Sequence, residues 1–157
     1  MKTFRTAAFF VVALSLLSGN AAAESAAEES AYDRELAAEL GADDYGMRPY
    51  VMAFLKSGSN PSENPEKARE LQAAHLANIR RMAEAGQLVL AGPFMDRGEV
   101  RGIYIFATGD IDEARAWTET DPAVQAGSLV MELHPWYGSA AIMQVNELHA
   151  RIAKADP

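Results

Sequence analysis

The chain contains no cysteine, which excludes disulfide bonds and the lipid-anchored form of an exported precursor, since that form needs a cysteine at its cleavage site. It also lacks a phosphate-binding glycine loop, a Gly-x-Ser-x-Gly elbow and a dinucleotide fingerprint, so we expect no cofactor. Basic residues are few, with 14 Lys and Arg against 22 Asp and Glu, for a net charge of −8. Such a chain repels phosphate backbones and anionic headgroups, and we expect no nucleic-acid or membrane-surface partner.

One long apolar run is present, from Thr6 to Leu17, after the positive charges of Lys2 and Arg5. It is too short to span a bilayer, and it precedes a small-x-small cleavage signature at residues 21–23. These features predict a signal peptide over residues 1–23, with no membrane insertion after its removal. The 157 residues less the first 23 leave 134, enough for one domain, and loss of the two basic residues changes the charge from −8 to −10. We expect a periplasmic protein, with secretion from the cell as the lesser option.

The mature chain divides into three predicted parts: an N-terminal helical extension over 24–47, a domain over 48–137 and a C-terminal helix over 138–157. Within the domain, strands are expected over 50–56, 87–94, 101–107 and 128–136, and helices over 65–85 and 110–117. Asn64 and Pro65 suit the start of the first of these helices, and Gly86 suits its end. Residues 121–127 are expected to form a turn. The order is βαββαβ, and it predicts an α+β fold with a four-stranded antiparallel sheet.

The first predicted strand is apolar on both faces. Met52 and Phe54 point one way, while Val51, Ala53 and Leu55 point the other. Two helices can cover one face of a four-stranded sheet, so the second face would expose several hundred Å² of apolar surface. This pattern favours a homodimer with face-to-face sheets, although the terminal helices could cover part of that face.

His75 lies on the apolar face of the first domain helix, together with Leu71 and Ile79. A polar ring directed at a core needs a hydrogen-bonding partner, and the best candidate is Asp121, after the second helix. Such a pair would fix one imidazole tautomer and leave the other nitrogen for proton transfer. This predicts lyase- or isomerase-like acid–base chemistry on a small molecule, with His75 and Asp121 as catalytic residues. The alternative is a non-catalytic binding or accessory protein in which the contact is structural.

Aromatic side chains supply candidate substrate-binding residues. Phe54, Phe94 and Tyr104, together with Trp117, could line an apolar pocket near the His–Asp pair, although aromatics in strands also fill cores and dimer seams.

Glu132 and His134 alternate on one face of the last strand, but a metal site normally needs three ligands. We therefore interpret them as ordinary strand polarity and predict no metal.

Several short motifs occur in a characteristic order along the domain. They are Tyr50-Val51-Met52-Ala53-Phe54-Leu55, His75, Gly86-Gln87-Leu88, Ala91-Gly92-Pro93-Phe94, Gly102, Glu113-Ala114, Asp121-Pro122, Gly127 and His134-Pro135-Trp136. Together they resemble the YCII-related (YciI-like) domain over roughly residues 48–137.

The resemblance implies a ferredoxin-like subunit that pairs into a dimeric α/β barrel. It also implies an active site built on a histidine and an aspartate, which correspond to His75 and Asp121. One relative of that family eliminates chloride from a chlorinated hydroxyquinol-type ring, which implies acid–base chemistry on small aromatic or carbonyl compounds. The signal peptide and the terminal helices extend beyond the minimal domain.

Overall fold

The structure, a computed structural model, describes residues 32–96 and 98–155. The predicted signal peptide lies outside the described residues. Residues from Glu35 onward form one compact unit, and of the part before it only residues 32–34 are described. Helix α2 (Arg34–Glu39) is followed by Gly41, whose φ of 67° is the left-handed conformation that ends helices.

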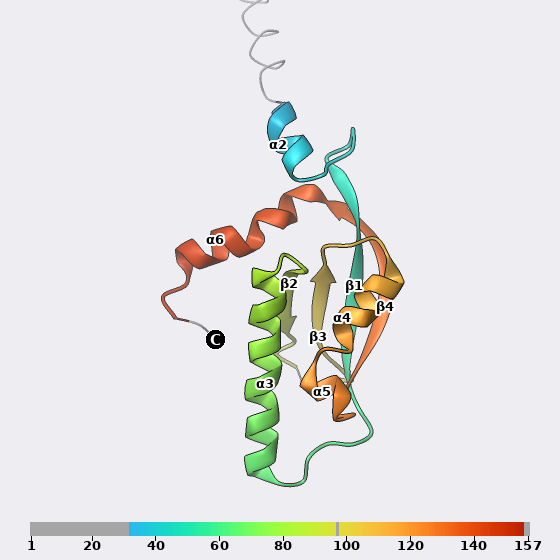
Figure 1. Cartoon of the computed structure of the whole chain (residues 1–157), viewed down its shortest axis with the longest axis vertical. Helices are drawn as coiled ribbons and strands as arrows, with labels where there is room; N and C mark the ends of the chain where they lie inside the picture. The colour runs from blue at the N-terminus through green and yellow to red at the C-terminus, as the bar shows by residue number, and fades with distance from the viewer. Residues whose placement is uncertain (1–31, 97, 156–157) are drawn as a thin grey trace, which may run out of the picture. The chain divides into compact units, whose positions relative to one another are not determined.

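A four-stranded antiparallel sheet forms the centre of this unit (Figure 1). Its strands are β1 (Met47–Ser57), β2 (Leu88–Pro93), β3 (Val100–Phe106) and β4 (Leu129–Ser139), in the spatial order β2-β3-β1-β4. The two long strands, β1 and β4, pair without interruption along their whole length. This arrangement confirms the predicted ferredoxin-like α+β fold. Strand β4 lies at an edge of the sheet, where a proline such as Pro135 is tolerated.

Three helices connect the strands. Helix α3 (Pro65–Glu84) begins as expected, because the Asn64 side chain accepts hydrogen bonds from the N–H groups of Glu66 and Lys67. Asp110 caps α4 (Ile111–Thr118) in the same way. The expectation of a plain turn over 121–127 was wrong, because this segment contains the short helix α5 (Pro122–Gln125), capped by Asp121.

One face of the sheet packs against the helices and forms the main core. Val51, Ala53 and Leu55 from β1 meet Met82 from α3 and Ala114 from α4. The central strand β3 adds Tyr104 and Phe106 to the same cluster. The alternation predicted for β1 is therefore present, and its helix-facing set is the one with the smaller side chains.

The second face is partly covered from the C-terminal side. Residues after β4 form a 3₁₀ helix, η1 (Ala140–Gln144), followed by α6 (Val145–Ile152), so the single helix expected over 138–157 is interrupted. Ile142 and Met143 of η1 pack against a second cluster made by Tyr50, Val89 and Ile105. Beyond this cover, Val130 of β4 remains 52% exposed.

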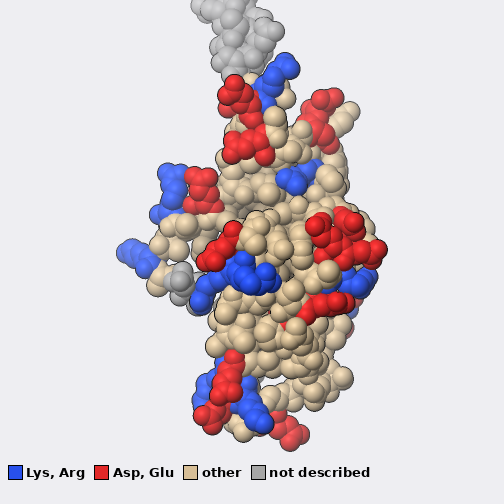
Figure 2. All heavy atoms as spheres, viewed as in Figure 1, with Lys and Arg blue, Asp and Glu red and all other residues tan. Residues whose placement is uncertain are grey.

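Across the described ranges, no helix combines the length and the apolar character needed to cross a membrane. Figure 2 shows acidic and basic side chains intermixed on the face in view, including around the first turns of α3.

Candidate active site

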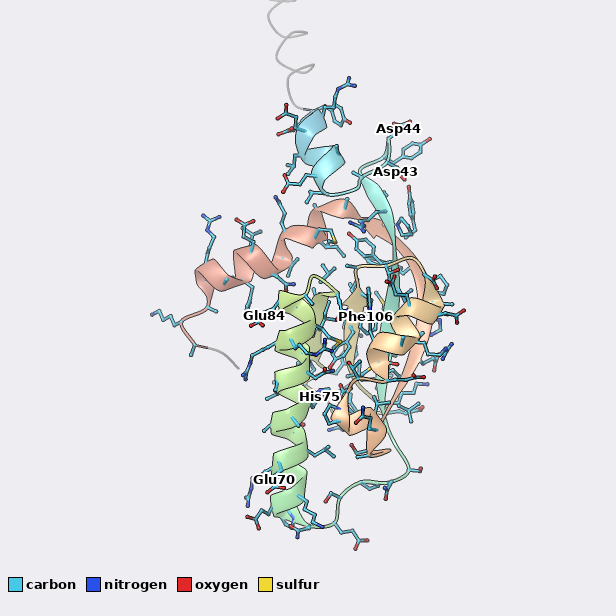
Figure 3. The ribbon with its side chains drawn as sticks, in the orientation of Figure 1. Asp43, Asp44, Glu70, His75, Glu84 and Phe106 are labelled. Atoms are coloured by element: carbon cyan, nitrogen blue, oxygen red, sulfur yellow. The ribbon has the colours of Figure 1, made fainter. Side chains whose placement is uncertain are left out.

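His75 occupies the middle of α3, on the side of the helix that faces the sheet (Figure 3). Its apolar neighbours on that face are Leu71 and Ile79, one turn on either side. The residue is 7% exposed. A ring buried to this degree must find its hydrogen-bonding partners within the protein.

The partner of His75 is Asp121. His75 Nδ1 and Asp121 Oδ2 are 2.7 Å apart, and the Asp121 side chain is fully buried. The other carboxylate oxygen, Oδ1, accepts the Ala123 N–H at 2.9 Å and so caps α5. Because a carboxylate only accepts hydrogen bonds, the Nδ1 atom of His75 carries the hydrogen, and Nε2 is the acceptor of the neutral ring.

Nε2 faces the hydroxyl of Tyr104, at 3.4 Å from the oxygen, a long contact for an O–H···N hydrogen bond. The two rings are nearly parallel, with an interplanar angle of 16° and centroids 6.2 Å apart. Burial raises the pKa of Tyr104 well above its usual range, and the Asp121 carboxylate raises it further. Tyr104 therefore stays protonated around neutral pH and can donate to Nε2.

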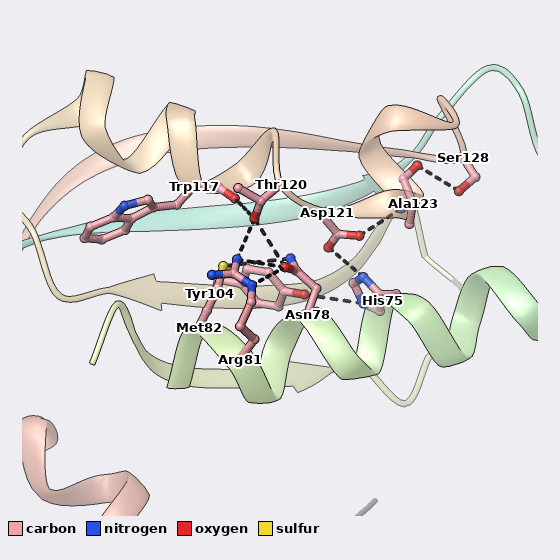
Figure 4. Close-up of polar contacts among 10 residues, drawn as sticks. All are labelled: His75, Asn78, Arg81, Met82, Tyr104, Trp117, Thr120, Asp121, Ala123 and Ser128. Carbon is pink, nitrogen blue, oxygen red and sulfur yellow. Dashed lines mark hydrogen bonds and ion pairs between the residues drawn. The ribbon is translucent and has the colours of Figure 1, made fainter. Parts of the chain in front are cut away.

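A second polar network supports the first from the next turn of α3 (Figure 4). Arg81 donates to Asn78 Oδ1 through Nη2 at 2.8 Å and through Nε at 3.2 Å. The same Nη2 also donates to Thr120 Oγ1 at 2.8 Å. Because Thr120 immediately precedes Asp121, this network ties the segment that carries the carboxylate to the helix that carries the imidazole. Asn78 lies three residues after His75, so helical spacing alone could have identified it.

The structure brings one of the predicted substrate-binding residues, Tyr104, to His75. Phe54 lies on the opposite face of the sheet, where its ring meets that of His134 at a centroid distance of 5.4 Å. Phe94 follows β2 and is 47% exposed. Trp117 packs on Phe106 at the edge of the main core, with centroids 5.8 Å apart. The predicted aromatic pocket around the His–Asp pair is therefore reduced to Tyr104.

Glu132 forms a polar row with Lys56 and His134 on the second face of the sheet. Glu132 Oε1 is 2.8 Å from His134 Nε2, and Glu132 Oε2 is 2.6 Å from the Lys56 ammonium. The hydrogen bonds from Lys56 and His134 lower the pKa of the Glu132 carboxyl. Within the described ranges, no three His, Asp or Glu side chains lie together as metal ligands would.

A cleft of about 550 Å³ lies beside the His–Asp pair. Its wall includes Leu71 and Gln72, one turn before His75 on α3, and Ala123, whose N–H binds Asp121. His75 itself is not part of this wall. The volume falls within the range of small-molecule sites.

Close to this cleft, the loop after β1 meets the turn before β4. Asn60 donates its N–H to Gly127 O at 3.0 Å and its side-chain Nδ2 to Ala126 O at 3.0 Å. A Cβ atom at Gly58 would lie 2.1 Å from Gly127 O, so only glycine permits this approach.

Comparison with known proteins identifies the family. The family model of the YCII-related domain matches residues 50–137, more than half of the chain. The chain belongs to the YCII-related domain family. No curated protein matches it. Among solved structures, the YCII-related chain is similar to a 5-chloro-2-hydroxyhydroquinone dehydrochlorinase (TftG) from Burkholderia phenoliruptrix AC1100 in complex with 2,5-dihydroxybenzoquinone. That match has 18% identity and a TM-score of 0.42, and it covers 57% of this chain and 93% of the other.

The contact between Asp121 and His75 predicts the tautomer of the ring in this YCII-related domain. In the wild type, ¹⁵N NMR of the imidazole should show a protonated Nδ1 and an unprotonated Nε2 at a pH where the ring is neutral. Asp121→Asn keeps an oxygen that can cap α5 but removes the carboxylate charge, so we expect a mixture of tautomers with little loss of stability. An unchanged tautomer in Asp121→Asn would show that the carboxylate does not control the ring.

Proposed function

We propose that this YCII-related domain is a cofactor-independent enzyme that performs acid–base chemistry on a small organic molecule. His75 acts as the general acid and base through Nε2, Asp121 orients the ring through Nδ1, and Tyr104 donates a hydrogen bond on the Nε2 side. The observation that carries this proposal is the 2.7 Å contact between His75 and the fully buried Asp121, beside a cleft of small-molecule size. Proton abstraction next to a carbonyl and elimination are the reactions that such a pair suits.

A non-catalytic role for the same pair is the second candidate. It is favoured by the low exposure of His75 and by the cleft wall, which includes the preceding turn of α3 but not the imidazole. In that case the contact would stabilise the packing of α3 against α5, and the cleft would bind a small molecule without converting it.

Proton transfer can be tested without knowledge of the natural substrate. The protein is incubated in D₂O with small carbonyl and phenolic compounds, and the loss of their C–H signals is followed by ¹H NMR. If His75 is the base, His75→Ala should slow exchange of any active compound by about 10² to 10⁴. The control is His149→Ala, which removes a histidine from α6.

His75→Ala is expected to lower the melting temperature under either candidate, because it leaves the buried carboxylate of Asp121 without one of its donors. The exchange assay therefore separates the two candidates. No exchange of any compound by the wild type would contradict the enzymatic role and favour the binding role.

We also infer that the protein is a homodimer that packs the second sheet face against its equivalent in another copy. Phe54 and Ile103 are half-buried there, and Val130 is 52% exposed. Segment η1 covers one end of this face, which leaves an apolar area next to the polar row of Lys56, Glu132 and His134. A second copy is the simplest cover for such a surface.

The dimer has a direct test by light scattering after gel filtration. The wild type should have twice the mass of one chain, and Val130→Asp should shift it to a single chain, because a charge would be buried at the interface. Leu148→Asp is the matched control, since Leu148 is 51% exposed but lies on α6. A monomeric wild type would contradict the inference.

Export to the periplasm is a further proposal, which rests on the N-terminal sequence. Mass spectrometry of the protein recovered from a periplasmic extract should find Glu24 as the first residue, because Ala23 ends the small-x-small motif. Recovery of chains that begin at Met1 from the cytoplasm would contradict it.

A further inference from the structure

Arg101 is placed by a β-bulge near the start of β3. Leu55 of β1 is paired with Gly102, but the next residue, Lys56, is paired with Val100, so Arg101 is the extra residue between two pairs. Strict alternation from Tyr104 would direct the side chain of residue 101 to the second sheet face, away from α3. A bulge interrupts the alternation and re-aims a side chain. Arg101 accordingly lies in the wall of the cleft beside α3.

The other residues of this cleft wall carry no charge. Apolar surface comes from residues such as Leu71 and Leu129, and neutral hydrogen-bonding groups come from residues such as Gln72 and Ser128. Arg101 is the one charged side chain among the described residues of this wall. In the adjoining hollow, Lys67 is accompanied by Glu63, so the charges there offset each other.

The guanidinium of Arg101 has no hydrogen-bond or ion-pair partner among the residues that the structure describes, although its backbone oxygen accepts the Phe94 N–H at 2.9 Å. It therefore presents five N–H donors and a full positive charge in a cleft with apolar surface. The chain as a whole has a net charge of −8, whereas the described wall of this cleft contains Arg101 and no acidic residue, so the cleft is locally positive.

We propose that the cleft binds a small organic carboxylate, whose carboxylate group is held by Arg101 and whose apolar part lies along Leu71 and Leu129. The planar guanidinium matches a carboxylate through two parallel hydrogen bonds, which a lysine could not provide. A ligand bound at Arg101 lies on the same side of the sheet as His75 and Asp121. Any conversion of this ligand would rest on the proposed acid–base function of that pair. The carboxylate site adds a substrate class to that function, and Arg101 is the residue that selects it.

The test compares benzoate with benzamide, which has the same shape but no charge. Each is titrated into the intact protein, and the backbone amide signals of Gln72, Ala123 and Ser128 are followed by ¹H–¹⁵N NMR. We expect benzoate to bind more tightly than benzamide by tenfold to a hundredfold, on the order of what hydrogen bonds to a charged group contribute. Arg101→Gln should remove this preference, whereas Arg151→Gln, which removes the same charge from α6, should keep it.

Three results would overturn the proposal. They are failure of benzoate to shift these signals, equal binding of both compounds by the wild type, and an unchanged preference in Arg101→Gln. An equal loss of preference in Arg151→Gln would also overturn it, because the effect would then come from overall charge. The imidazole tautomer and the exchange assay do not depend on Arg101. The acid–base role can therefore be correct even if the carboxylate site is wrong. Equally, the carboxylate site can be correct even if the acid–base role is wrong.

Discussion

The buried carboxylate of Asp121 is the constraint on which the rest of the site depends. An ionised group without solvent contact is stable only when its oxygens are fully hydrogen-bonded. Here one oxygen is bound by the imidazole of α3 and the other by the first turn of α5, so a single side chain joins two helices, and its partner His75 lies 46 residues away in the chain. Removal of either donor would leave charge unsatisfied in the core. The orientation of His75 and the position of α5 are therefore parts of one interaction, and the same geometry that would prepare the ring for chemistry also stabilises the fold.

Helix α5 shows how local and tertiary interactions combine. Four residues are too few to form a stable helix in isolation, since helix nucleation is unfavourable. It forms because Asp121 caps its start, Pro122 presets its first turn, and the Gly58–Gly127 approach fixes its end against the loop after β1. The cleft is bounded by this assembly, so its shape depends on contacts between four separate stretches of the chain.

Features that depend on periodicity and helix capping could be predicted from the sequence. Features that depend on strand register or on most tertiary contacts could not. The apolar stripe with His75 and the Asn64–Pro65 helix start follow from local rules. The partnership with Asp121 is a tertiary contact, and it was predicted because a buried imidazole needs a polar partner. A similar pair of a capping residue and a proline, Asp121–Pro122, stands at the start of α5, but that segment is too short to show a helical period. Alternation places Phe54 opposite Val51, yet nothing local says which face the helices cover. The bulge at Arg101 arises from pairing between β1 and β3, and no residue pattern in either strand predicts it. Tyr104 was predicted to line a pocket, whereas the structure makes it a hydrogen-bonding neighbour of the imidazole.

The proline in β4 has a consequence for how copies of the chain can associate. An edge strand of 11 residues offers a row of backbone donors and acceptors to any extended peptide, the geometry from which fibrils grow. Pro135 interrupts that row, because its nitrogen carries no hydrogen. Growth by strand addition along β4 is therefore hindered.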